Sequence, residues 1–105
     1  MATIWGVVSE AGAMLSGSTD RDGNPAFKVA NVSPGVYQIV FESTFPSVPA
    51  ITGSQVLYGK TSEIPLDNIV FPLLDAEGAT AVVGDSSGNL INRSFSFIVA
   101  GDDGR

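Results

Sequence analysis

Turn-forming residues recur about every ten positions along this chain, and this spacing constrains the fold more than any other feature of the sequence. Gly, Pro, Asp, Asn and Ser gather at positions 10–12, 18–25, 33–35, 45–49, 75–78 and 86–89. The segments between them are rich in Val, Ile, Phe and Tyr, which favour strands. Regular turns at this spacing are typical of an antiparallel sandwich or barrel.

The residues between the turns alternate between apolar and polar, as expected for strands with one buried face. Tyr37, Ile39 and Phe41 share one face of their segment, and Phe95, Phe97 and Val99 alternate with serines near the end of the chain. Pro72 interrupts the nearest helical candidate. The pattern predicts an all-β, compact antiparallel sandwich of six to eight short strands, at about 3–9, 13–17, 26–32, 36–43, 50–58, 67–74, 79–84 and 94–100.

Two of the predicted strands are apolar on both faces. The segment at 68–74 reads "NIVFPLL", and Val36 and Val40 share the outward face of their strand with Gln38. An apolar outward face has to be covered, either by a second layer of the same chain or by another subunit. Both alternatives are open at this point, and the pattern favours oligomerisation.

Length and charge limit the classes of function. The 105 residues fit one sandwich domain, 1–105, with an N-terminal hairpin at about 3–17 and a core at about 26–101. The net charge is −6 and the five basic residues are scattered, so neither nucleic acid nor an anionic membrane is an expected partner. No signal-peptide pattern or apolar span is present, so we expect a soluble chain made in the cytoplasm, with a virion or an exported appendage as the alternative location.

The string "GDSSG" at Gly84–Gly88 matches the G-x-S-x-G pattern of a hydrolase nucleophile elbow, with Ser86 at its centre. Such a serine needs a general base, and the chain contains no His. The residues that follow read as a loop that enters a strand rather than as a helix. A Ser–Lys pair with Lys28 or Lys60 is the remaining catalytic alternative. We expect no enzyme activity and no cofactor.

The stretch "STDRDGNP" places Asp20, Asp22 and Asn24 at alternate positions around Gly23. This spacing resembles the start of a calcium-binding loop, but the Glu and the flanking helices of an EF-hand are missing. Asp and Gly are equally typical of a tight hairpin turn. We favour the turn and keep calcium as the alternative.

A polar run before the last predicted strand is the best ligand candidate. Carboxylates, amides and an Arg fork suit a neutral, multi-hydroxyl ligand such as a sugar, and an aromatic ring often stacks on it. The same residue types also make up ordinary loops. The candidate glycan-binding residues are Asp85, Ser87, Asn89, Asn92, Arg93 and Tyr58.

The segments Gly35–Ile51 and Gly84–Gly101, with their G-x-Y-x-I-x-F and F-x-F-I-x-A-G patterns, resemble the H-type lectin domain and its bacterial and phage-tail relatives. The opening "WGVVSEAGAMLSGS" resembles the hairpin that precedes the bacterial versions. This resemblance implies a homotrimeric sandwich that binds sugar at its tips. Asp85 matches the family's acidic site residue, whereas "VVGDSSGN" lacks the aromatic or His that precedes it.

Two functions follow from these observations as expectations. The first is a non-enzymatic, lectin-like carbohydrate-binding domain that assembles as a homotrimer. The second is a structural trimerisation or tail-fibre module without a small-molecule ligand, in which the two strands that are apolar on both faces form the interface.

Overall fold

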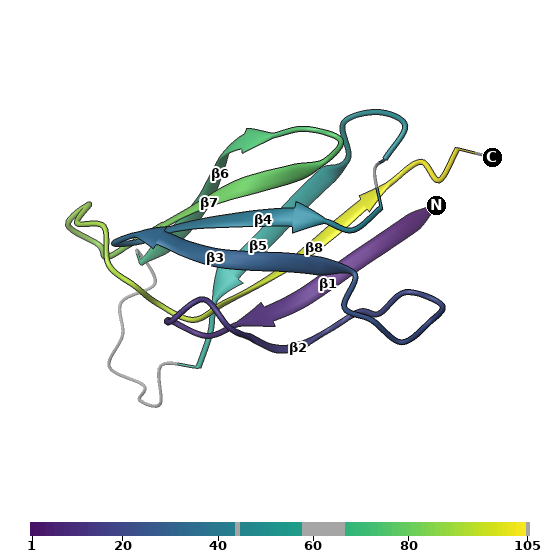
Figure 1. Cartoon of the computed structure of the whole chain (residues 1–105). Coiled ribbons are helices and arrows are strands. Elements are labelled where there is room, and N and C mark those ends of the chain that lie inside the picture. Colours follow the sequence, from purple (N-terminus) through teal and green to yellow (C-terminus); the bar gives the residue numbers. More distant parts are fainter. Residues whose placement is uncertain (44, 58–66, 105) are drawn as a thin grey trace.

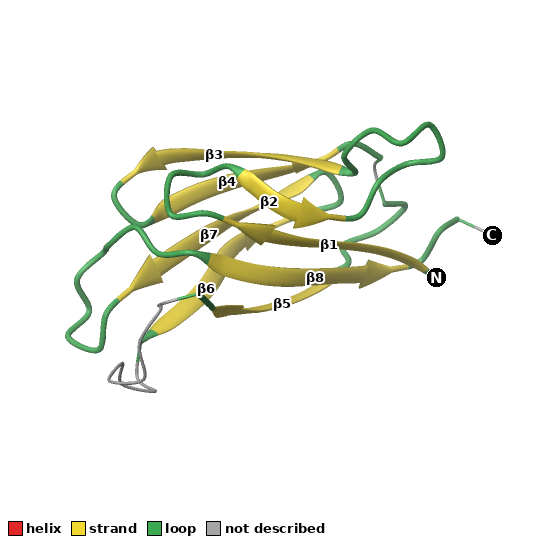
Figure 2. Cartoon of the chain, turned by 90° about the horizontal axis from the view of Figure 1, so that it is seen from below, coloured by secondary structure: helices red, strands yellow, loops and turns green. Residues whose placement is uncertain are grey.

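The computed structural model describes residues 1–43, 45–57 and 67–104, which form eight strands in two layers (Figures 1 and 2). The strands are β1 (Ala2–Val8), β2 (Met14–Gly17), β3 (Phe27–Ser33), β4 (Val36–Phe41), β5 (Ala50–Gln55), β6 (Asn68–Leu74), β7 (Gly78–Gly84) and β8 (Phe95–Gly101). Their positions confirm the predicted all-β fold. The main difference in length is β5, which ends at Gln55 rather than near position 58.

Each layer is a four-stranded antiparallel sheet, and together they form a sandwich. One sheet has the order β2-β1-β8-β5 and the other β3-β4-β7-β6. The chain crosses between the sheets after β2, β4, β5 and β7. Both chain ends lie at one end of the sandwich, and the β7–β8 connection lies at the other (Figure 1).

The N-terminal hairpin is an integral part of one sheet. β1 pairs with β8 over its whole length, from Ala2 opposite Gly101 to Val8 opposite Phe95. On the inner side, Gly6 leaves room for the ring of Phe27 from the opposite sheet, whose atoms would overlap a Cβ at that position. The hairpin therefore contributes both a central strand and part of the wall of the core.

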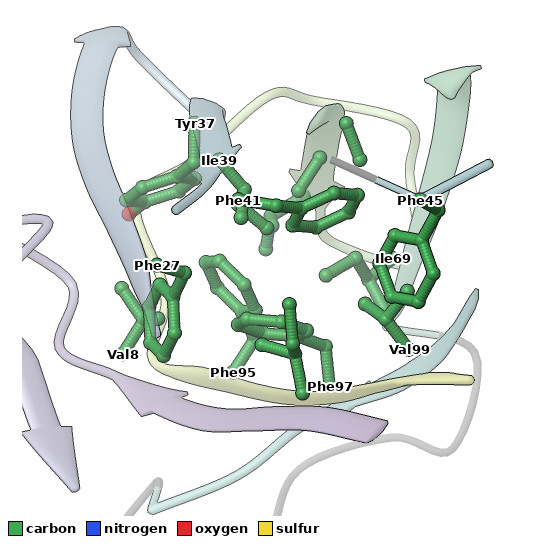
Figure 3. Close-up of a cluster of buried hydrophobic side chains, with 14 residues drawn as sticks. Val8, Phe27, Tyr37, Ile39, Phe41, Phe45, Ile69, Phe95, Phe97 and Val99 are labelled. Carbon is green, nitrogen blue, oxygen red and sulfur yellow. The ribbon is translucent and has the colours of Figure 1, made fainter. Parts of the chain in front are cut away.

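Aromatic side chains from both sheets fill the core (Figure 3). The rings of Phe27 and Phe97 meet edge to face with centroids 4.9 Å apart, and those of Tyr37 and Phe95 do so at 5.0 Å. Burying each such side chain contributes about 1.5–3 kcal/mol to the free energy of unfolding. These buried rings confirm the inward faces that the alternation predicts.

Strand β6 is an edge strand with an interrupted ladder. Pro72 lies in it, where the register with β7 shifts between Val70 and Leu73. Proline has no N–H to donate, so an edge strand or a bulge is where a sheet accepts it. The residue that argues against a helix in the sequence thus sits at an irregular edge.

Candidate functional site

The polar run forms the connection between β7 and β8, and its first part is a tight turn. Asp85 Oδ1 accepts hydrogen bonds from the backbone N–H groups of Ser87, at 2.9 Å, and Asn89, at 3.0 Å. Its Oδ2 accepts a bond from Asn89 Nδ2 at 3.3 Å. Gly88 follows with φ of +84°, a left-handed conformation that glycine adopts at little cost. Both carboxylate oxygens of Asp85 therefore bind the turn itself.

These bonds also act on the acidity of Asp85. The backbone N–H of Asn89 is the main cause that lowers the pKa of this carboxyl below its ordinary value of 3.8, and Ser87 and the Arg93 charge act in the same direction. Hydrogen bonds donated to a carboxylate stabilise its charged form. Asp85 is therefore an anion at neutral pH that organises its loop.

Ser86 lies in this turn and is exposed. The chain after it completes the turn and enters β8, so the strand, turn and helix of a nucleophile elbow are not assembled around this serine in the described part of the chain. The G-x-S-x-G match is part of a hairpin-like connection.

The same turn occurs at Asp20. Its Oδ1 accepts bonds from the backbone N–H groups of Asp22 and Asn24, each at 2.9 Å, and Gly23 has φ of +83°. Among the described residues, no group of three or more acidic, His or Cys side chains is placed to hold a metal ion. The bonds within this stretch are those of the tight turn that the sequence favours.

Asn92 fastens the polar run to the turn between β3 and β4. Its Oδ1 accepts bonds from the backbone N–H of Gly35, at 2.7 Å, and from Nδ2 of Asn31, at 3.2 Å. The same Nδ2 also lies within bonding distance of the carbonyl oxygens of Ser33 and Val36. The side chain of Asn92 thus binds protein groups at the tip of the sandwich.

Arg93 points into a polar network under the loop. Its Nη1 lies 3.1 Å from Oδ2 of Asp67, whose side chain is 5% exposed, and 3.4 Å from Oε1 of Gln55. Nε2 of Gln55 donates to the carbonyl oxygens of Asn68 at 2.6 Å and Gly84 at 2.7 Å. Because Gln55 belongs to β5 and these carbonyls to β6 and β7, the network joins the two sheets.

The structure therefore brings five of the six sequence-predicted site residues into one loop, where their side chains differ in partners and in exposure. The side chains of Asp85, Asn89, Asn92 and Arg93 all bond to the protein. Ser87, Asn89 and Asn92 are exposed. Tyr58 lies outside the described residues. Sequence reasoning missed Gln55 and Asp67. In the sequence, the only sign of Gln55 is its spacing of two from Gly53 and four from Ile51, which places it on the inward face of its strand. No feature of the sequence indicates Asp67.

The outer faces of the two sheets are a second candidate surface. Of the five basic and eleven acidic residues, Lys28 alone lies within a strand in the part of the chain that the structure describes. The other described charges are in the connections and at the ends. Both broad faces of the sandwich are therefore almost uncharged, although the chain as a whole is strongly acidic.

We name each face by its largest residues. The valine face is the outer side of β3-β4-β7-β6, and its main apolar residues are Val36, Val40, Val70, Leu73 and Val82. The tryptophan face is the outer side of β2-β1-β8-β5, and it consists of Thr3, Trp5, Val7, Ser16, Ala50, Thr52, Ser54, Ser96, Ile98 and Ala100.

Comparisons of the chain with protein-family models, with curated proteins and with solved structures found no match. In the described part of the chain, no helix is long and apolar enough to cross a membrane.

Proposed function

We propose that this domain is a non-enzymatic structural module that assembles with copies of itself. The observation that carries the proposal is that charge lies almost entirely at the ends of the sandwich. Lys28 is the one charged residue in a described strand, which leaves two broad and almost uncharged faces. Interface cores are depleted of charged residues, whereas the solvated face of a sheet usually carries polar side chains.

The valine face supports assembly most directly. Val40, Val70 and Leu73 are 46%, 52% and 67% exposed. Val40 lies on β4 and the other two on β6 of the same sheet, with β7 and its outward Val82 between them. These residues come from the two strands that the sequence shows to be apolar on both faces. Contiguous exposed apolar surface of this kind is typical of a surface that another protein covers.

The resemblance to H-type lectin domains suggests the order of the assembly and its setting. We propose a homotrimer, in the role of a trimerisation or tail-fibre module in an appendage. The sandwich architecture agrees with that resemblance but does not distinguish it from other sandwiches.

Size-exclusion chromatography with light scattering tests the proposal. The expected mass at micromolar concentration is a multiple of the 10.8 kDa chain, three for the trimer. A mass of one chain at all concentrations up to about 100 µM, where even a weak contact of about −5.5 kcal/mol is half-formed, would contradict self-assembly.

Carbohydrate recognition by the loop is a second candidate function. The observation that favours it is the internal bonding of Asp85, which holds the turn in one conformation and presents Ser87 and Asn89 as exposed neutral groups. A preorganised loop binds with less loss of conformational entropy than a loop that must order on binding.

A glycan array tests this second function, with Ser87→Ala and Asn89→Ala as variants. Saturable binding that both substitutions weaken supports the site. Ser47→Ala is the matched control, because Ser47 is exposed in the β4–β5 connection at the opposite end of the sandwich. The absence of binding by the wild-type protein across a broad array would remove the lectin function.

A further inference from the structure

The tryptophan face is neutral over its whole area. Among the described residues, its outward positions on four strands carry neither an acid nor a base. Trp5 is the only Trp of the chain and is 43% exposed. Ile98 lies directly opposite it on β8 and is 52% exposed. β1 and β8 lie side by side in one layer (Figure 2).

The residues around this pair are small. Ala50, Thr52 and Ser54 on β5 and Ser96 and Ala100 on β8 surround Ile98, and a shallow hollow opens between Thr52, Ser54, Ser96 and Ile98. The exposed Trp5 and Ile98 project from a flat surface of small neutral side chains. Trp is enriched in interface cores and in binding hot spots, and charged residues are depleted there.

Charge indicates which partner fits such a face. Two copies of a chain with net charge −6 repel each other unless their acids stay apart. The described acids are in connections beyond the strand ends, so contact through the neutral face keeps them at its rim. A basic partner would instead be drawn to the acidic ends, and the tryptophan face offers it no charge to pair with.

The area of one face is too small for a stable interface between two copies. Strands of four to seven residues, spaced about 4.8 Å apart with a rise of about 3.3 Å per residue, cover roughly 400 Å² per face. Two such faces in contact bury roughly 800 Å², below the approximately 1,200 Å² at which stable interfaces begin. A copy that also uses its valine face makes a second, separate contact with another copy, so each chain is held by two weak contacts rather than by one.

We infer that the tryptophan face is a contact surface for a second copy of this chain, centred on Trp5 and Ile98, in addition to the valine face. This inference rests on the proposed self-assembly and names one surface that it uses. The apolar area around the Trp5–Ile98 pair is what the partner copy covers.

The single Trp makes the contact directly measurable. Trp5 should fluoresce at shorter wavelength in the assembly than in the separated chain, because the partner removes water from its ring. The emission should shift to longer wavelength on dilution, over the same concentration range in which light scattering shows the mass falling. Trp5 emission that does not change while the mass falls would overturn the inference.

Ile98→Asp and Thr52→Asp are the test variants, since both positions are exposed on this face and keep Trp5 as the probe. We expect each to lower the mass at a given concentration and to shift the emission to longer wavelength. Ser86→Asp, in the exposed loop, adds the same charge away from both faces and should leave mass and emission unchanged. Circular dichroism shows whether each variant is folded.

Val40→Asp on the valine face separates the two proposals. An assembly that dissociates with Val40→Asp but is unaffected by Ile98→Asp and Thr52→Asp would overturn the inference and leave self-assembly standing. A wild-type protein that is monomeric throughout would overturn both. Loss of assembly in Ile98→Asp and Thr52→Asp, with folded monomers, supports the inference.

Discussion

At the scale of single residues, one five-residue turn occurs three times in the described part of the chain. It lies at Ser9–Ala13, Asp20–Asn24 and Asp85–Asn89. In each, the side chain of the first residue accepts a bond from the fifth backbone N–H, and the fourth residue is a glycine with positive φ. Asp and Ser are favoured there because they bond their own backbone. The acids that suggested a calcium loop and a sugar site therefore have a common structural role.

Asp85 should make the stability of the fold depend on pH. Its folded-state pKa lies below the ordinary value of 3.8, so as the pH falls the unfolded chain takes up the proton first. The stability that Asp85 contributes is complete above that value and is lost as the pH falls through the folded-state pKa. We expect Asp85→Asn, which keeps an acceptor for the turn, to lose less thermal stability on acidification.

The measurement compares the melting temperatures of wild type and Asp85→Asn at about pH 6 and about pH 3. Every other acid is present in both proteins, so the difference between the two pH responses isolates Asp85. An equal fall in both proteins would show that the turn bonds do not favour the carboxylate.

Gly35 should tolerate substitution less well than other glycines with positive φ. Its φ is +71°, and an added Cβ would overlap the carbonyl oxygen of Val83. At Gly23, with φ of +83°, an added Cβ meets nothing within 4 Å. Gly23→Ala should therefore cost only the left-handed backbone term, about 1–2 kcal/mol, and Gly35→Ala should cost more.

Denaturant unfolding of the two glycine variants measures this difference. The excess for Gly35→Ala reports how closely the β3–β4 turn packs against β7 and the loop that Asn92 fastens. Equal losses in the free energy of unfolding would mean that the tip of the sandwich accommodates the added methyl group at no cost in free energy.

At the scale of elements, local pattern was sufficient for the strands and insufficient for the site. The alternation around Tyr37 and Phe97 predicts which side chains are buried, because a strand repeats every two residues. The partner of Arg93 is not predictable in this way. Asp67 is 26 residues away and precedes β6 of one sheet, whereas Arg93 precedes β8 of the other, so only the packing of the two sheets brings the two side chains together. Arg93 therefore looked like a ligand residue in the sequence.

Arg93→Ala should destabilise the fold strongly. It leaves the carboxylate of Asp67, 5% exposed, without the guanidinium, and breaking one partner of a buried ion pair costs about 3–5 kcal/mol. Lys28→Ala is the matched control, because Lys28 pairs with Glu42 at 3.6 Å with a side chain that is 79% exposed. Exposed pairs of this kind contribute about 0–1 kcal/mol.

Urea denaturation of both variants gives the comparison, read as the shift of the unfolding midpoint at constant slope. A small effect of Arg93→Ala, similar to that of Lys28→Ala, would show that water enters below the loop and solvates Asp67. In that case Arg93 would again be a candidate ligand-binding residue.

At the scale of the whole molecule, the two neutral faces point in opposite directions, since they are the outer sides of two stacked sheets (Figure 2). Contacts that join opposite faces in a head-to-tail manner extend without closing, whereas a closed ring needs contact surfaces inclined to each other. A closed trimer therefore uses only one of the two faces, and contact through both faces would extend the assembly beyond three chains.

The distribution of charge predicts how assembly responds to salt. Contact through neutral faces contains few ion pairs for salt to weaken, while copies of net charge −6 repel each other through their acidic ends. Salt screens this repulsion, because the Debye length falls from about 10 Å at 0.1 M to about 3 Å at 1 M. We therefore expect the dissociation constant to decrease as NaCl rises, and Trp5 emission at a fixed low protein concentration to shift to shorter wavelength. An assembly that dissociates in high salt would instead be held together by ion pairs between the charged ends, and both neutral faces would then have to be assigned to another partner.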